Sequence, residues 1–169
     1  MRGVRTPLII ALVIVAALAV RIADVWDVLP ATMGSHFGPS GAADAFMSKG
    51  AFFLTMACVG GGSVALVFAA PLLIARLPPR LVNLPNRDYW LENEARRQVA
   101  VDKLGAQLGW LGASTTALLA LAVELAVRAN LERAAFANGP FMVALVLYLV
   151  LTIAFVVWTF RAFEIPASS

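Results

Sequence analysis

The chain carries a few chemically reactive side chains close to long apolar segments. His36 is its only histidine, and Asp44 and Lys49 follow it in the same stretch of sequence. Glu124 lies at the end of a later apolar run, where a carboxylate is costly to bury and is often functional. An imidazole, two carboxylates and an amine could together bind a ligand, sense pH or hold a cation. We expect these four residues to meet in one polar cluster, with Lys49 beside Glu124 and His36 closing the site.

Simpler roles for the same side chains stay open. Arg128 stands four positions after Glu124, so the two could form an ion pair at the membrane interface instead. The imidazole of His36 could simply fix a turn through hydrogen bonds. A tight zinc site would need more His or Cys than this chain has, so we predict no metal site and no cofactor.

No catalytic motif accompanies these residues. The chain has no nucleophile elbow, phosphate-binding loop, paired-histidine zinc motif or dinucleotide fingerprint. The run Gly60 to Gly62 has no lysine directly after it, so it is no phosphate cradle. We therefore predict no catalytic residue and favour a non-enzymatic protein that binds a peptide, lipid or protein partner. A small dimeric transporter or transporter accessory subunit is the alternative, and a membrane enzyme is less favoured.

Four apolar runs must position these side chains. A helix needs roughly 20 apolar residues to cross a bilayer, and we predict spans at residues 7–28, 51–76, 104–127 and 141–160. Apolar residues make up 61% of the chain and charged residues 14%, which excludes an ordinary soluble protein. The first run also fits a secretory signal, but its apolar character continues past Arg21, so we expect it to remain as a span. The predicted fold is an all-α integral membrane four-helix bundle in one domain, residues 1–169, with the lipid bilayer as its first partner.

Basic residues predict the orientation of the chain. Of the 13 Lys and Arg residues, nine fall on one side of the predicted spans and four on the other, and the richer side is normally cytoplasmic. This places both termini in the cytoplasm. The net charge of +3 lies in short loops beside the spans, which argues against nucleic-acid binding and favours anionic lipid headgroups.

The two longer loops differ in composition. The outer loop, residues 29–50, is rich in Gly, Pro and Ser, and we expect it to be irregular. The inner loop contains prolines that end the second span, and then a segment, residues 78–103, in which we expect an amphipathic helix on the cytoplasmic surface. Glu92 and Arg96 in that segment have the spacing of an i,i+4 ion pair.

Small residues recur every four positions in the middle two spans. One stripe runs through Gly61 and the other through Gly109, and small side chains let helix backbones approach closely in lipid. We expect the two stripes to face each other. Four spans are few for an independent carrier, so the transporter alternative would require a homodimer.

Two motifs in the loops resemble a bacterial family of uncharacterised membrane proteins. The outer motif is Pro30-x-x-Met33-x-x-His36-Phe37-x-x-x-Gly41-x-x-Asp44-x-Phe46-x-Ser48-Lys49, and the inner motif is Asn83-Leu84-Pro85-Asn86-Arg87-Asp88-Tyr89-Trp90-Leu91. The same domain forms the N-terminal part of SdpI-type immunity proteins, which resist a secreted peptide toxin and signal its presence. The chain is more similar to the stand-alone four-span members.

The resemblance and the residue types together give the candidate sites. The binding residues that we expect in and near the outer loop are Pro30, His36, Gly41, Asp44, Lys49 and Glu124. The residues of the inner motif that we single out are Asn83, Pro85, Asp88, Tyr89 and Trp90.

Overall fold

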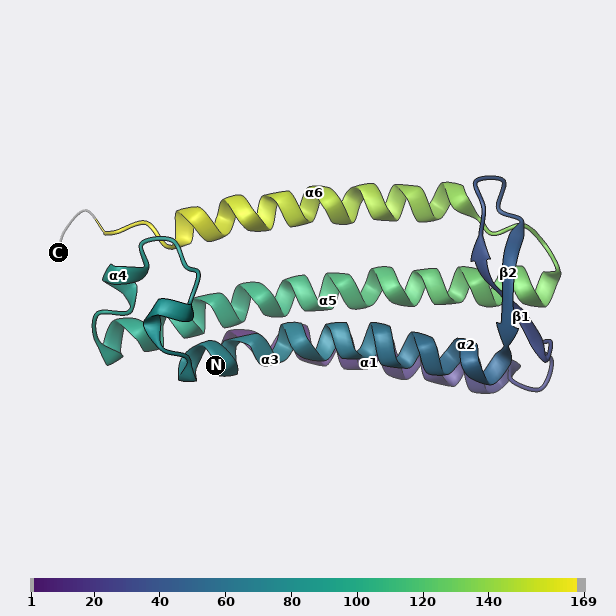
Figure 1. Ribbon diagram of the computed structural model, residues 1–169, viewed down its shortest axis with the longest axis horizontal. Helices are drawn as coiled ribbons and strands as arrows, with labels where there is room; N and C mark the ends of the chain where they lie inside the picture. The colour runs from purple at the N-terminus through teal and green to yellow at the C-terminus, as the bar shows by residue number, and fades with distance from the viewer. Residues whose placement is uncertain (1, 167–169) are drawn as a thin grey trace.

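The computed structural model describes residues 2–166 and is helical apart from one small sheet. Four helical segments are long and apolar enough to cross a membrane (Figure 1). They are α1 (Arg2–Val25), the combined segment of α2 (Lys49–Met56), η1 (Ala57–Gly61) and α3 (Gly62–Arg76), then α5 (Glu94–Glu132) and α6 (Asn138–Ala162). The predicted all-α membrane fold is confirmed.

Helix α5 is the centre of the molecule. It packs against α1, α3 and α6, whereas α1 and α3 have few close contacts with each other. In Figure 1, α5 runs between α6 on one side and α1 and α3 on the other. The apolar residues of α6 are largely exposed, and hydrogen bonds help to hold it to α5: Thr115 with Tyr148, and Thr159 with Gln107. Hydrogen bonds of this kind hold helices together in lipid, because lipid tails are as apolar as the side chains and the hydrophobic effect does not drive the helices together.

Glycines of α5 determine how closely its neighbours approach. A Cβ on Gly109 would lie 2.8 Å from Cγ of Pro7 in α1, and one on Gly112 would lie 2.7 Å from the ring of Phe68 in α3. A Cβ on Gly61 would meet nothing within 4 Å. The prediction that the Gly61 and Gly109 stripes face each other was therefore wrong, because Gly109 serves the contact with α1.

The second span is interrupted where its glycines cluster. Residues Ala57–Gly61 form a π-helix, with α-helix before and after them. Such a π-bulge accommodates an extra residue in the helix and is frequent at functional sites.

The segment between the second and third spans closes one end of the molecule. It contains a short 3₁₀ turn, η2 (Pro79–Leu81), and α4 (Arg87–Trp90). Residues 94–103, which we expected to belong to an amphipathic interfacial helix, are instead the first turns of α5, whose N-cap Asn93 accepts a bond from the Arg96 amide. The predicted Glu92–Arg96 ion pair is confirmed.

The segment expected to be an irregular outer loop forms a β-hairpin. Strands β1 (Thr32–Phe37) and β2 (Ala43–Ser48) pair antiparallel, with register shifts on both sides of the pair His36–Ala45. Its turn uses Gly41 at φ +81°, a conformation that favours glycine. At the other end of β2, Ser48 caps α2 by accepting a bond from the Ala51 amide. We call the end of the molecule that carries this β-hairpin the hairpin end. The opposite end, with α4 and the start of α5, is called the basic end.

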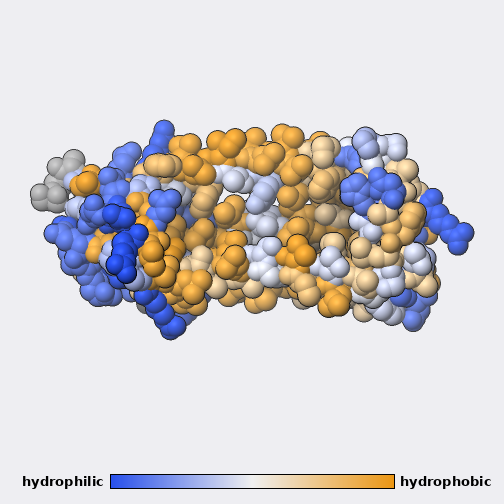
Figure 2. All heavy atoms as spheres, viewed as in Figure 1, coloured by the Kyte–Doolittle hydropathy of each residue, from blue (hydrophilic) through white to orange (hydrophobic). Residues whose placement is uncertain are grey.

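The surface has the pattern of a membrane protein. Figure 2 shows an apolar middle between two hydrophilic ends. At the hairpin end, a buried cluster around Met33, Phe52 and Val127 joins β1, α2 and α5. At the basic end, a second cluster around Trp90, Leu104 and Phe163 joins α4, α5 and the end of α6. The two clusters fix the ends of the spans to each other.

Candidate functional site

The hairpin is fastened to α5 by one asparagine. The side-chain Oδ1 of Asn130 accepts a hydrogen bond from the Gly34 amide at 2.6 Å, and its Nδ2 donates to the Gly34 carbonyl at 3.1 Å. The same Nδ2 also lies 2.8 Å from the Ala126 carbonyl of α5. One side chain thus satisfies both backbone groups of Gly34 on the side of β1 that faces away from β2.

Lys49 fastens the hairpin to α1. Its Nζ donates to the carbonyls of Trp26 at 2.6 Å and Leu29 at 3.5 Å, and it lies 4.6 Å from the centre of the Trp26 ring. These carbonyls follow the last turn of α1, where backbone acceptors lack helical partners. Lys49 therefore caps the end of the first span.

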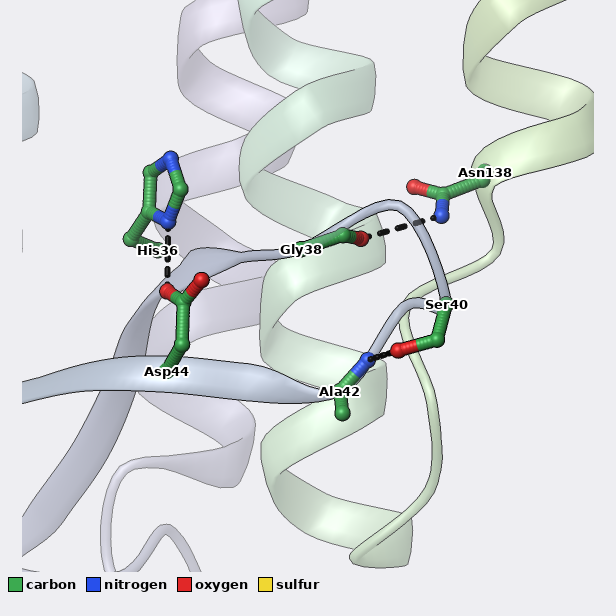
Figure 3. Close-up of polar contacts among 6 residues, drawn as sticks. All are labelled: His36, Gly38, Ser40, Ala42, Asp44 and Asn138. Carbon is green, nitrogen blue, oxygen red and sulfur yellow. Dashed lines mark hydrogen bonds and ion pairs between the residues drawn. The ribbon is translucent and has the colours of Figure 1, made fainter.

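The tip of the hairpin rests on the connection into α6. Asn138 donates to the carbonyls of Gly38 at 3.3 Å and Pro39 at 2.9 Å, and Figure 3 shows the Gly38 contact. The Phe136 amide donates to the Gly41 carbonyl at 2.8 Å. A Cβ at position 41 would lie 2.6 Å from the Phe136 carbonyl, so the close approach as well as the turn requires glycine. The hairpin is thereby tied to three spans.

His36 and Asp44 face each other across the two strands. His36 Nδ1 lies 2.5 Å from Asp44 Oδ1, and the two side chains are 71% and 55% exposed (Figure 3). Exposed pairs of this kind add little to stability. Within residues 2–166, no cluster of three His, Cys, Asp or Glu residues is suited to hold a metal ion.

Glu124 does not join this group. Its carboxylate pairs with Arg128 at 2.6 Å and with Arg21 of α1 at 3.4 Å. The prediction that Lys49 is the partner of Glu124 was wrong, while the alternative ion pair with Arg128 is confirmed. Arg21 and Arg128 both reach the carboxylate, and Lys49 is engaged by the end of α1.

A cleft of about 480 Å³ lies between the hairpin and the end of α5. Pro30, Gly34 and Phe46 line it from the hairpin side, and Asn130 and Arg133 line it from α5. Phe46 is 64% exposed. Arg133, which ends α5 in a left-handed conformation with φ 50°, forms no ion pair with another residue among 2–166. The cleft thus offers an aromatic surface and a free cation side by side.

The inner motif holds the end of α6 rather than forming a second open site. Trp90 Nε1 and Asn86 Nδ2 both donate to the Phe163 carbonyl at 2.8 Å, and Lys103 donates to the Ala162 carbonyl at 3.0 Å. These carbonyls belong to the last turn of α6 and its cap, and Trp90 is buried.

The other motif residues lie around this contact. The Tyr89 ring lies beneath the Arg96 guanidinium at 4.0 Å, and Asp88 pairs with its neighbour Arg87. Asn83 is exposed and Pro85 half-buried. The motif is therefore accounted for mainly by packing at the basic end.

Sequence reasoning missed three residues of the site: Asn130, Arg133 and Asn138. Asn130 and Asn138 bind backbone groups of the hairpin that lie 96 to 100 positions away, and no local pattern reports such contacts. A usable signal was the placement of an asparagine close to the end of a long apolar helix. Burying its amide group there costs free energy unless the group has hydrogen-bond partners.

A family model described as "Domain of unknown function (DUF1648)" matches residues 12–59. The matched stretch covers part of α1, the whole hairpin, α2 and the start of η1. It confirms the resemblance of this segment to an uncharacterised domain. Searches among curated proteins and among solved structures found no match.

Proposed function

We propose that the protein is a non-enzymatic membrane protein of the bacterial envelope that binds a peptide or protein segment on its β-hairpin. The observation that carries this proposal is the cleft between the hairpin and the end of α5, where the exposed Phe46 and Arg133 lie side by side. The hairpin is held in place beside this cleft by Asn130, Lys49 and Asn138. Aromatic and arginine side chains dominate the binding energy of many interfaces, which suits Phe46 and Arg133 to this task.

The free edge of β2 supports a peptide as the ligand. Asn130 takes both backbone groups of Gly34, so Gly34 and Phe46 form a pair without mutual hydrogen bonds. The amide and carbonyl of Phe46 then point away from β1. An extended peptide can add to such an edge through backbone hydrogen bonds, while pockets beside the strand select its side chains.

The resemblance of residues 30–49 to the SdpI-type domain favours a secreted peptide as the partner. An immunity or signalling role would follow from that choice. We place the protein in the inner membrane, with the hairpin end outside the cytoplasm and both termini in the cytoplasm, because nine of the 13 Lys and Arg residues fall on the side of the basic end. Reporter fusions after Gly38 should be active outside and fusions after Asn86 inside, and the reverse pattern would overturn this orientation.

Co-purification from native membranes tests the binding proposal. The Phe46→Ser variant should lose a partner that the wild-type protein retains, because it removes the exposed aromatic ring from the cleft. Val28→Ser is the matched control, since Val28 is 71% exposed near the hairpin end but does not line the cleft. Equal partner recovery by both variants would count against the hairpin face.

A further inference from the structure

A large apolar groove runs along the membrane part of the molecule. Its volume is about 1060 Å³, with α1 as one wall, the second span as the other and α5 as the floor. Asp27 and Thr116 are the polar residues among those that line it. The groove exists because α1 and α3 each pack on α5 but have few close contacts with each other.

The groove opens toward the bilayer. Leu12 and Val15 on the α1 wall are 58% and 51% exposed, and Ala57 and Gly61 on the opposite wall are exposed as well. At the hairpin end, the contact between the rings of Trp26 and Phe53, 5.5 Å apart, joins the two walls above the buried cluster around Met33. An occupant would therefore come sideways from the membrane and not from the water at the hairpin end.

The length of the groove indicates what it holds. It follows α1 from Leu8 to Trp26, which is about 27 Å at 1.5 Å per residue. The hydrocarbon core of a bilayer is about 30 Å thick, so the chains of one lipid leaflet cover only about half of that length. A transmembrane helix covers all of it. We propose that the groove is the docking site for a transmembrane helix of a partner membrane protein.

The walls and the charged end of the groove fit such a helix. Gly61 lies in the π-helix with no atom within 4 Å of the position of a Cβ, so another backbone can come close there. Asp27, at the hairpin end, makes no ion pair or hydrogen bond with another residue among 2–166. It would pair with a Lys or Arg at that end of the partner helix.

A second copy of this chain fits less well. Its most exposed helix is α6, which lies on the other side of α5 from α1 and α3 (Figure 1). Docking α6 of one copy into the groove of the next would leave a free α6 and a free groove. Such head-to-tail contacts give rings or open chains rather than a closed dimer. We therefore assign the groove to a different protein.

Photo-crosslinking in native membranes tests this assignment. A photoreactive residue placed at Val64, which lines the groove, should form an adduct with another protein. Mass spectrometry should map that adduct to a transmembrane segment with a Lys or Arg at its hairpin-side end. Adding Gly61→Leu should reduce the adduct by roughly tenfold, because a large side chain then fills the space of the partner helix.

Gly62→Leu is the matched control. A Cβ at Gly62 also meets nothing within 4 Å, but Gly62 does not line the groove. Both variants should therefore unfold at the wild-type temperature, and only Gly61→Leu should lower the yield of the adduct. Adducts to lipid alone or to a second copy of this chain, the absence of any adduct, or equal yields from the two variants would each overturn the proposal.

Discussion

Asn130 should control whether the hairpin is held in place. In the Asn130→Ala variant, the Gly34 amide loses its hydrogen-bond acceptor and the Gly34 carbonyl loses its donor. Neither group has a replacement in β2, since both point away from that strand. Two hydrogen bonds at about 1 kcal/mol each, with some penalty for the groups left unpaired, give about 2–3 kcal/mol.

Amide hydrogen exchange of the purified protein measures this loss directly. Local opening that is easier by about 2–3 kcal/mol should speed exchange at Gly34 by roughly 30-fold to 150-fold. The α5 amides around Gly109 should keep their wild-type protection, because α1 and α3 still cover them. Asn138→Ala serves as the control, since it frees the tip of the hairpin at Gly38 and leaves Gly34 bonded.

One result would refute the reasoning. If Gly34 exchanges at the wild-type rate in Asn130→Ala, the asparagine does not fasten the hairpin. The proposed binding face would then lack its rigid support.

Five further substitutions test the packing of the spans by thermal unfolding in detergent. Trp90→Ala should lower the free energy of unfolding by about 3–5 kcal/mol, because a buried ring is lost. Trp90→Phe should lower it by only about 1 kcal/mol, because only the hydrogen bond to the Phe163 carbonyl is lost. Equal losses from the two variants would show that the ring is not packed. Gly109→Leu should destabilise the fold by about 1–3 kcal/mol or more through its clash with α1. Gly61→Leu should leave the unfolding temperature unchanged. A larger loss of stability in Gly61→Leu than in Gly109→Leu would contradict the described packing. Tyr148→Phe should cost about 0.6 kcal/mol by removing the hydrogen bond between α5 and α6, and a loss several times larger would mean that α6 depends on that single bond.

Hydropathy was sufficient to find the spans, because a lipid environment leaves few alternatives to a long apolar helix. The bounds were less accurate: α5 begins at Glu94, ten residues before the predicted span. The polar turns from Glu94 to Lys103 extend beyond the apolar core yet continue the same helix. Composition alone could not distinguish them from a separate helix on the membrane surface.

The hairpin shows where local sequence signals fail. Gly, Pro and Ser residues predicted an irregular loop, but β1 is stabilised by a contact with Asn130, 96 positions away from Gly34. The partner of Lys49 was missed for a similar reason. Matching of opposite charges suggested Glu124 as the partner of Lys49, whereas Lys49 donates to a backbone carbonyl at the end of α1. Backbone acceptors at helix ends carry no signal in the sequence of side chains.

The most direct test of the hairpin as a binding face is the labelling rate of a cysteine at Phe46. The variant Phe46→Cys, with Cys58→Ser to remove the native thiol, is treated with a membrane-impermeant maleimide in intact cells and again after purification. Val28→Cys in the same background is the reference. We predict that both positions react from outside, and that only position 46 reacts more slowly in cells than after purification, because a partner covers it. Equal rates at position 46 in both preparations, or labelling only from the cytoplasmic side, would contradict a binding face on the hairpin.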